Sequence, residues 1–444
     1  MKITSIKLGP KYQDKQRMMT ALAGRCFSAK EALLACNSGL LDQTSPTALS
    51  ALDAKVKSGA SLLFQEAFAG MVFVVSATND PIRQALFPQM SFSEAIAKGT
   101  AFLQLMAVKE ALNGLSAEEI AGMAAATTLD LVFRPNLPRV TETCGMGGDR
   151  GWETKEVKTI NASTLSALVL ASMGIPTFKH GSYGNTTRVG STDVPVNFGA
   201  RICISEPREI LDLFAETGFW FSDAHSVKTI HYLSHLLMME TVNHILGPMT
   251  VPVARSTRLF KVVGVNHHVN PETMAMAYAI LHRKGFLNLG GVVVVAGLDE
   301  IPQRKHPTAK WVRDHTFLDE VSPRATLVSL AREGSFLGTF VLTDENFGAP
   351  PLQEERLKIP NTLEGLMRAN EAALQGTDPV LSPYLARNAS LGLLAMSLSK
   401  ENPDLLAELP HYYEDCLKII GTGRALEKLK KYVKASGGSF KDWL

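Results

Sequence analysis

The segment GMGGDRGWETKEVKTINAST, residues 145–164, joins a glycine-rich loop to a cluster of hydroxyl and amide side chains. A glycine loop after a strand lets backbone N–H groups approach phosphate oxygens, and the positive end of the next helix favours the same anion. Here the strand is TETCG, and the helix is expected to begin near Ser163. Two interpretations remain open: an anion-binding loop, or a tight turn followed by a helix cap. The residues concerned are Gly145, Gly147, Gly148, Asp149, Asn161, Ser163 and Thr164.

Two further polar segments follow apolar runs. KHGSYGNTTRVGSTD, residues 179–193, is rich in small and basic side chains that suit a second loop closing over an anion. The run GGVVVVAG is followed by Asp299 and Glu300, at the carboxyl end of an expected buried strand, where open α/β sheets bind ligands. Paired carboxylates favour Mg²⁺ over Zn²⁺, because Mg²⁺ takes oxygen ligands and shares them with substrate phosphates. The three segments together indicate a site for an anion and its magnesium ion.

The elements that must position these loops change character along the chain. Apolar residues recur with helical spacing from about residue 28 to 130, and Ser116 with Glu119 predicts a capping box. Short β-branched runs then alternate with helical ones, which indicates an α/β fold with a largely parallel central sheet flanked by helices. Strands are expected within 139–145, 175–181, 260–265 and 290–297, and helices within 163–174, 271–284, 379–398 and 411–435.

Composition restricts the class of protein. The chain has 444 residues, which favours two domains, with 45% hydrophobic and 20% charged residues. Lys and Arg total 45 against 43 Asp and Glu, so no nucleic-acid surface is expected. Five scattered cysteines favour reduced thiols, and the first residues show no secretory pattern, so a cytoplasmic protein is expected. The apolar runs are too short to span a membrane.

Seven short motifs in order resemble the anthranilate phosphoribosyltransferase family, whose relatives include the pyrimidine nucleoside phosphorylases. They are GMGGD, NAST, KHG followed by GSTD, NHILGPMT, GLDE, VLTDENFG and TGRALEKL, over roughly residues 90–435. The resemblance implies a helical N-terminal domain, residues 1–130, joined by a helical insert of about 222–246. It implies a larger α/β domain, residues 131–221 and 247–444, with the active site in the cleft between the two. It also implies a homodimer joined through the helical domains.

The resemblance assigns roles by motif position. Phosphoribosyl diphosphate (PRPP) would be held by Gly145, Gly147, Gly148, Asp149, Asn161, Ser163, Thr164, Lys179 and Ser191. Mg²⁺ would be held by Ser163, Asp299 and Glu300, and a small aromatic acceptor would meet His180, Ser182, Tyr183 and Ser234. The implied reaction needs no covalent nucleophile: diphosphate leaves as positive charge grows on the ribose, and fixed cations and amides stabilise the leaving group.

Three departures from the family pattern bear on the acceptor. Ser182 and Tyr183 stand where the family has Asn-Arg after KHG, and Ser234 falls where a family arginine binds the anthranilate carboxylate. Because a serine cannot replace a bidentate carboxylate partner, an aromatic or heteroaromatic acceptor other than anthranilate is expected. The third departure is an insertion, residues 150–160, between Asp149 and Asn161. This insertion either extends over the bound substrates or is a solvent-exposed loop.

Other interpretations remain. A nucleoside phosphorylase would use phosphate in place of diphosphate, and a family member without catalysis would bind nucleic acid; the retained GGD and DE motifs favour the transferase. His231 and His235 are spaced like zinc ligands but lack an evident third ligand, so packed or exposed histidines are favoured. An alternative is that His225, His231 or His235 lines the acceptor pocket. His267 and His268 precede a helix and are interpreted as part of a loop and cap.

Overall fold

The computed structural model describes residues 48–130, 134–147, 157–184, 188–202, 207–223, 228–237, 241–251, 253–304, 306–399 and 404–444. Several expectations lie outside these residues. They concern Gly148, Asp149, His225, the first 47 residues and most of the 150–160 insertion. Among the described helices, none is long and apolar enough to cross a membrane.

The N-terminal part is helical, as the spacing of apolar residues predicts. Its helices are α4 (Ala48–Lys57), α5 (Phe64–Thr78), α6 (Asp80–Leu86), α7 (Phe92–Asn113) and α8 (Ala117–Thr127). The capping box of Ser116 and Glu119 is confirmed, because each residue accepts a hydrogen bond from the backbone of the other. The helical spacing is interrupted between α4 and α5, where Gly59 has a left-handed φ of 83°. Helix α12 (Lys228–Leu237) packs against α5 and α7.

The central sheet is largely parallel, as expected. Its order is β4-β3-β1-β5-β6-β8-β9, in which the first five strands pair in parallel and β8 and β9 are antiparallel. A short β7 pairs with β6, and β2 pairs with β10 outside this sheet. The strands are β1 (Arg139–Gly145), β2 (Val157–Lys158), β3 (Thr177–Gly181), β4 (Phe219–Asp223), β5 (Arg258–Gly264), β6 (Asn288–Leu298), β7 (Thr316–Leu318), β8 (Ala325–Arg332), β9 (Ser335–Leu342) and β10 (Ile359–Pro360).

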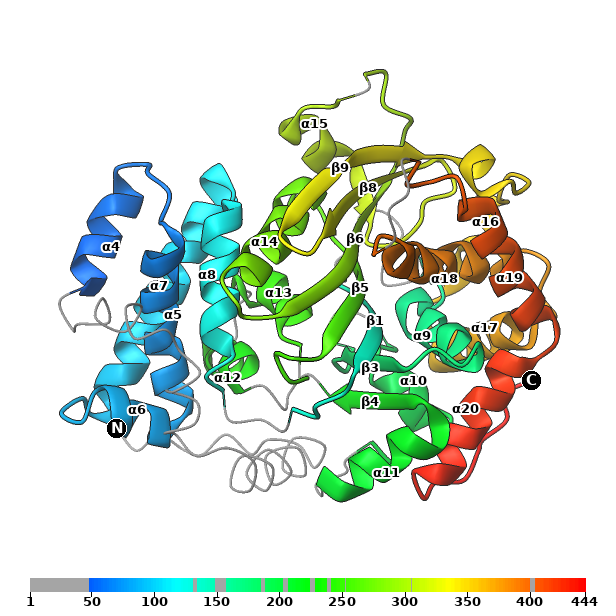
Figure 1. Cartoon of the computed structure of the whole chain (residues 1–444), viewed down its shortest axis with the longest axis horizontal. Coiled ribbons are helices and arrows are strands. Elements are labelled where there is room, and N and C mark those ends of the chain that lie inside the picture. The colour runs from blue at the N-terminus through cyan, green and yellow to red at the C-terminus, as the bar shows by residue number, and fades with distance from the viewer. Residues whose placement is uncertain are drawn as a thin grey trace.

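Both faces of the sheet are covered by helices (Figure 1). In β6, Val292 and Val294 belong to the core shared with α5, α7, α8 and α14, whereas Val293 and Val295 belong to the core on the other face. This alternation follows from the two-residue period of a strand. The remaining helices are α9 (Ala162–Ser172), α10 (Asp193–Asn197), α11 (Pro207–Thr217), α13 (Asn243–Leu246), α14 (Pro271–Arg283), α15 (Ala309–His315), α16 (Glu354–Leu357), α17 (Leu363–Gln375), α18 (Leu381–Ser397), α19 (Leu409–Gly421) and α20 (Arg424–Ala435).

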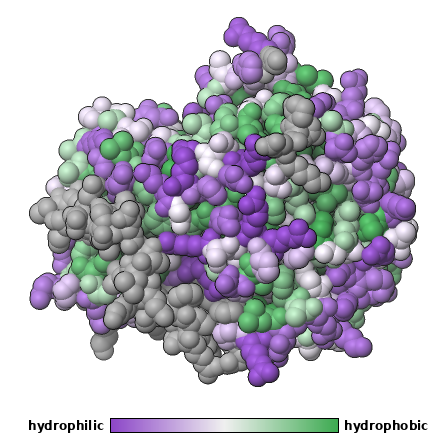
Figure 2. Space-filling view, viewed as in Figure 1, coloured by the Kyte–Doolittle hydropathy of each residue, from purple (hydrophilic) through white to green (hydrophobic). Residues whose placement is uncertain are grey.

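The register of the parallel strands aligns their carboxyl ends. Gly145 of β1 is paired with Gly264 of β5, which is paired with Val295 of β6. Parallel strands expose ligand sites at this edge. On the face shown in Figure 2, hydrophilic side chains gather around the middle of the molecule and over the projection where Figure 1 places α15. The division into two domains stays a prediction.

Candidate active site

The glycine loop after β1 lies against Asp319. The backbone N–H of Gly147 donates to Asp319 Oδ2 at 2.7 Å, and Asp319 is buried. A Cβ added to Gly145 would come within 2.1 Å of Asp319 Oδ2, and one added to Gly264 would come within 1.6 Å of the Asp319 carbonyl oxygen. Only glycine allows such close approach of backbone to carboxylate. The loop, β5 and the segment after β7 therefore meet at one point.

The neighbouring carboxylate, Glu320, is half-buried in this region. Its Oε2 accepts hydrogen bonds from Tyr384 at 2.8 Å and from Thr159 at 3.3 Å. Burial, together with the charge of Asp319, raises the pKa of Glu320 from 4.5 to about 8. Two adjacent carboxylates with little exposure to solvent repel each other, so a bound cation would stabilise their ionised forms. Asp319 and Glu320 are called the carboxylate pair below.

The expected carboxylates, Asp299 and Glu300, follow the end of β6, and their role as metal ligands stays a prediction. Asp299 lies four residues beyond Val295, about 13 Å further along at about 3.3 Å per residue. Its carboxylate is 2.8 Å from His315 Nδ1, and Glu300 is 3.6 Å from the other nitrogen of that ring. The chain after β6 makes an excursion through α15 and returns along β7, antiparallel to β6, which brings the second Leu-Asp-Glu sequence back to the glycine loop.

The second polar loop brings Lys179 and Ser191 together, as the motifs predict. A Cβ added to Gly181 would lie 3.1 Å from Ser191 Oγ and 3.2 Å from Lys179 Nζ. Lys179 is buried, and burial lowers the pKa of its ammonium group from 10.5 to about 8. Asp193 closes the loop, because its Oδ2 accepts from the backbone N–H of Gly184 at 2.8 Å and from that of Gly190 at 2.9 Å.

The expected anion ligands near the start of α9 differ in whether their side chains already have hydrogen-bond partners. The side chain of Asn161 is hydrogen-bonded within the protein: its oxygen accepts from the Asn370 amide, and its NH₂ group donates to the Val189 carbonyl. Its backbone N–H donates to the Asn370 side-chain oxygen. Asn161 is the N-cap residue, but its side chain makes no capping hydrogen bond. Ser163 accepts at its backbone carbonyl from Thr143 at 2.6 Å. Thr164 is different, because its buried hydroxyl has no hydrogen-bond partner in the described structure.

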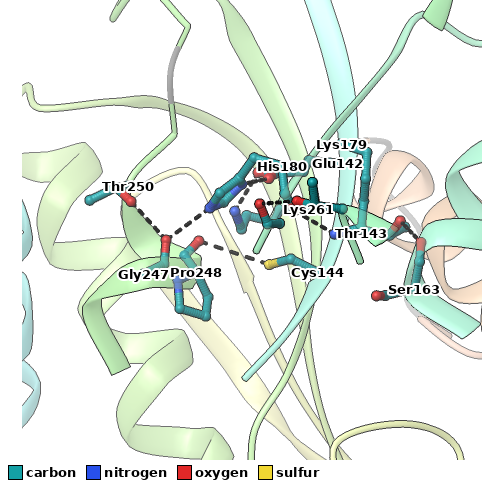
Figure 3. A network of polar contacts seen from close by, with 12 residues as sticks. Glu142, Thr143, Cys144, Ser163, Lys179, His180, Gly247, Pro248, Thr250 and Lys261 are labelled. Carbon is teal, nitrogen blue, oxygen red and sulfur yellow. Dashed lines mark hydrogen bonds and ion pairs between the residues drawn. The ribbon is translucent and has the colours of Figure 1, made fainter. Parts of the chain in front are cut away.

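Behind the two loops lies a buried network of charged side chains (Figure 3). Glu142 of β1 accepts a hydrogen bond from Lys261 of β5 on one carboxylate oxygen. Its other carboxylate oxygen is hydrogen-bonded to Nδ1 of His180 of β3. His180 Nε2 lies 2.9 Å from the Gly247 carbonyl oxygen. Both ring nitrogens of His180 therefore face oxygen atoms that can accept hydrogen bonds. Burial raises the pKa of Glu142, but the cations of Lys261 and His180 lower it to about 2.

The expected acceptor residues are spread over two regions. His180 is held by the buried network, and the carbonyl of Ser182 accepts from the N–H of Thr192 at 2.9 Å. Tyr183 is half-buried against the apolar core. The hydroxyl of Ser234 lies 2.8 Å from that of Thr241 and accepts from the Asn243 amide at 2.9 Å. Acceptor contact by these four residues stays a prediction.

Sequence reasoning missed several residues that the fold brings to the site. The carboxylate pair carried a usable signal, because Leu-Asp-Glu occurs twice, at 298–300 and 318–320. No local pattern links Glu142 to Lys261, which lie 119 residues apart. The same holds for Tyr384, which donates to Glu320 from α18, and for Asn266, which donates to the Gly147 carbonyl at 2.8 Å.

The chain is similar in sequence and fold to known proteins. Residues 137–316 match the model of a glycosyl transferase family, a/b domain. A Pyrococcus abyssi anthranilate phosphoribosyltransferase is 30% identical over 296 residues, covering 65% of this chain and 79% of that protein. A Bordetella pertussis anthranilate phosphoribosyltransferase is 28% identical over 306 residues, covering 68% and 77%. The structure of the Saccharomyces cerevisiae anthranilate phosphoribosyltransferase in complex with PRPP and Mg shares the fold, with a TM-score of 0.63 at 21% identity, covering 89% of this chain and 99% of that chain.

Proposed function

Since the chain belongs to the anthranilate phosphoribosyltransferase family and is therefore a phosphoribosyltransferase, we propose that it transfers the ribosyl 5-phosphate group from PRPP to an aromatic or heteroaromatic acceptor. The observation that carries the proposal is the contact between the Gly147 amide and Asp319. It joins an anion-binding loop to a pair of carboxylates, which is the arrangement that a metal-bound diphosphate requires.

The oxygen donors around the glycine loop fit Mg²⁺. Asp319 and Glu320 supply adjacent carboxylates, and Glu320 has a pKa raised to about 8 by burial and by the charge of Asp319. We propose this carboxylate pair as the magnesium ligands in place of Asp299 and Glu300. Ser163 remains a candidate ligand from the resemblance. When bound, Mg²⁺ neutralises the diphosphate and polarises it as a leaving group.

The chain's own groups would then stabilise and position the donor. The buried ammonium of Lys179 lies beside Ser191. Thr164 presents a hydroxyl without a partner at the first turn of α9, where the helix dipole favours an anion. These groups act on the charge that develops on the diphosphate as its bond to the ribose breaks. The acceptor attacks the opposite face of the ribose, and the role of the protein in this step is to position it.

We further propose that anthranilate is not the preferred acceptor. The resemblance puts Ser234 where the family has a carboxylate-binding arginine, and its hydroxyl is neutral and bonded to Thr241 and Asn243. Diphosphate release is measured with anthranilate and with other aromatic acids, amines and nitrogen heterocycles. Turnover of anthranilate with a kcat/KM equal to that of the Pyrococcus abyssi relative would refute the acceptor proposal and leave the donor proposal intact.

Calorimetric titration with PRPP, with and without Mg²⁺, tests the donor site. The native chain is compared with Asp319→Asn/Glu320→Gln and with the matched pair Asp299→Asn/Glu300→Gln. We expect Mg²⁺-dependent affinity to fall at least about a hundredfold in the first variant, because both charged metal ligands are lost. The second variant is expected to bind like the native chain. The reverse result would move the metal site to Asp299, and no binding by the native chain would lead to phosphate and nucleosides as ligands.

A further inference from the structure

Three side chains of types that bind transition metals meet outside the carboxylate pair. Glu110 lies on α7, His244 on α13, and His268 in the loop between β5 and α14. Their ligand atoms all lie within 4.8 Å of one another. Glu110 Oε1 is 3.1 Å from His244 Nε2 and 2.9 Å from His268 Nδ1. We propose that Glu110, His244 and His268 form a binding site for a divalent transition-metal ion, with Zn²⁺ as the occupant.

The spacing of the ligand atoms suits tetrahedral zinc. Zinc bonds of about 2.0–2.1 Å in a tetrahedron put neighbouring ligand atoms about 3.4 Å apart. The two measured oxygen–nitrogen distances, 2.9 and 3.1 Å, are slightly shorter, so small outward shifts would admit the ion. Two histidines and one glutamate form a known zinc ligand set in which the fourth position stays open. The His268 side chain is 40% exposed, so solvent reaches the site.

The hydrogen bond on the far side of the His244 ring fixes its tautomer. His244 Nδ1 lies 2.6 Å from the carbonyl oxygen of Thr241, and a carbonyl only accepts. Nδ1 therefore carries the hydrogen, and in the neutral ring Nε2 presents its lone pair to the Glu110 carboxylate. That geometry requires a cation or a proton between the two atoms. Metal-bound histidines are commonly oriented by such a bond from the other nitrogen to a carbonyl.

Glu110 is buried and supplies the one carboxylate among the three side chains. Two imidazolium rings would satisfy the same carboxylate through ion pairs alone. Spectroscopy separates a bound metal ion from a pair of imidazolium rings, because only a transition-metal ion such as Co²⁺ produces a ligand-field spectrum.

The site would join segments that are distant in the sequence. The His268 N–H donates to Asn266 Oδ1 at 3.0 Å, and the Asn266 amide donates to the Gly147 carbonyl at 2.8 Å. An ion at the site would therefore connect helix α7 to the loop that holds the glycine turn. Metal binding is measured without PRPP, so the test does not depend on the proposed transfer reaction.

Cobalt and zinc titrations of the full chain, stripped of metal and without an affinity tag, test the proposal. Co²⁺ is added and the visible ligand-field absorption recorded, and Zn²⁺ is then used to displace it. We expect one Co²⁺ per chain with the intense absorption of a tetrahedral site, and displacement by Zn²⁺. His268→Ala, which alters a half-exposed side chain, is expected to weaken binding at least about tenfold because one of three ligands is lost.

Matched variants separate this site from others. His411→Ala removes an exposed histidine on α19 and is expected to bind Co²⁺ like the native chain. Glu110→Gln is expected to weaken binding as His268→Ala does. Absence of stoichiometric binding by the native chain, or full binding by His268→Ala, would overturn the proposal.

Discussion

Burial changes the chemistry of Lys179. The side chain is 1% exposed, and loss of solvation lowers the pKa of its ammonium group from 10.5 to about 8. The charged form is the one that attracts a diphosphate, and it dominates below this pKa. As the pH rises through about 8, the free protein loses this charge. A lysine that is an ordinary cation in the sequence thus becomes sensitive to mildly alkaline pH in the fold.

We expect the affinity for PRPP, measured by calorimetry with saturating Mg²⁺, to decrease as the pH is raised from 8 to 9.5. The decrease is at most about tenfold per pH unit, since one proton must bind for each lysine charged. Lys179→Arg keeps its charge over this range and should show a flatter pH profile. Equal slopes for the native chain and for Lys179→Arg would show that another group titrates.

At the scale of elements, three adjacent strands create the buried network. The order β3-β1-β5 puts Glu142 between two cations, and Glu142 is the register partner of Lys261. Both side chains are fully buried. Removing one partner of such a pair leaves an uncompensated charge in the protein interior, which costs far more than losing a surface ion pair. The strand pairing and the charge pairing therefore depend on each other.

We expect Glu142→Gln to lower the free energy of unfolding by about 3–5 kcal/mol, because Lys261 loses its carboxylate. Urea denaturation of Glu142→Gln, Lys261→Met and the double variant measures the coupling. In the native chain, the contribution of Glu142 is present above pH 4.5, its ordinary pKa, and is lost as the pH falls toward 2. Glu364→Gln, which breaks an exposed pair with Arg368, is the control and should cost less than about 1 kcal/mol. Equal costs would contradict the network's role.

At the scale of the whole molecule, apolar side chains remain on the surface of the helical part. Val108 is 56% and Leu112 is 73% exposed, and they lie one turn apart on α7. Leu63, 58% exposed, lies just before α5. Large exposed apolar groups on one segment are typical of an interaction surface. The homodimer implied by the resemblance would bury such a surface.

We predict that the native chain is a homodimer and that Leu112→Glu shifts it toward monomer, because a charge would have to be buried at the interface. Light scattering after size-exclusion chromatography measures the mass. Leu211→Glu, on α11 and 41% exposed in the native chain, is the control and should leave the mass unchanged. A native monomer, or a dimer that Leu112→Glu leaves intact, would refute this interface.

The sequence by itself determined the class of fold and the two polar loops. Helical spacing, β-branched runs, the capping box at Ser116 and the glycines after TETCG all depend on neighbours within a few residues, so they can be read locally. The same local patterns support Lys179 beside Ser191, since both belong to one loop.

Only the tertiary structure decided which acidic pair lies at the loop. Leu-Asp-Glu occurs twice, at 298–300 and 318–320, and the copy that follows the long apolar run is not the one at the loop. The choice depends on β7 pairing antiparallel to β6, which turns the chain back and carries Asp319 to Gly147 while Asp299 stays beyond the strand end. The same is true of Glu110, His244 and His268, which come from three distant segments. Strand pairing and helix packing bring together residues that are far apart in the sequence, so these contacts cannot be predicted from the spacing of residues along the chain.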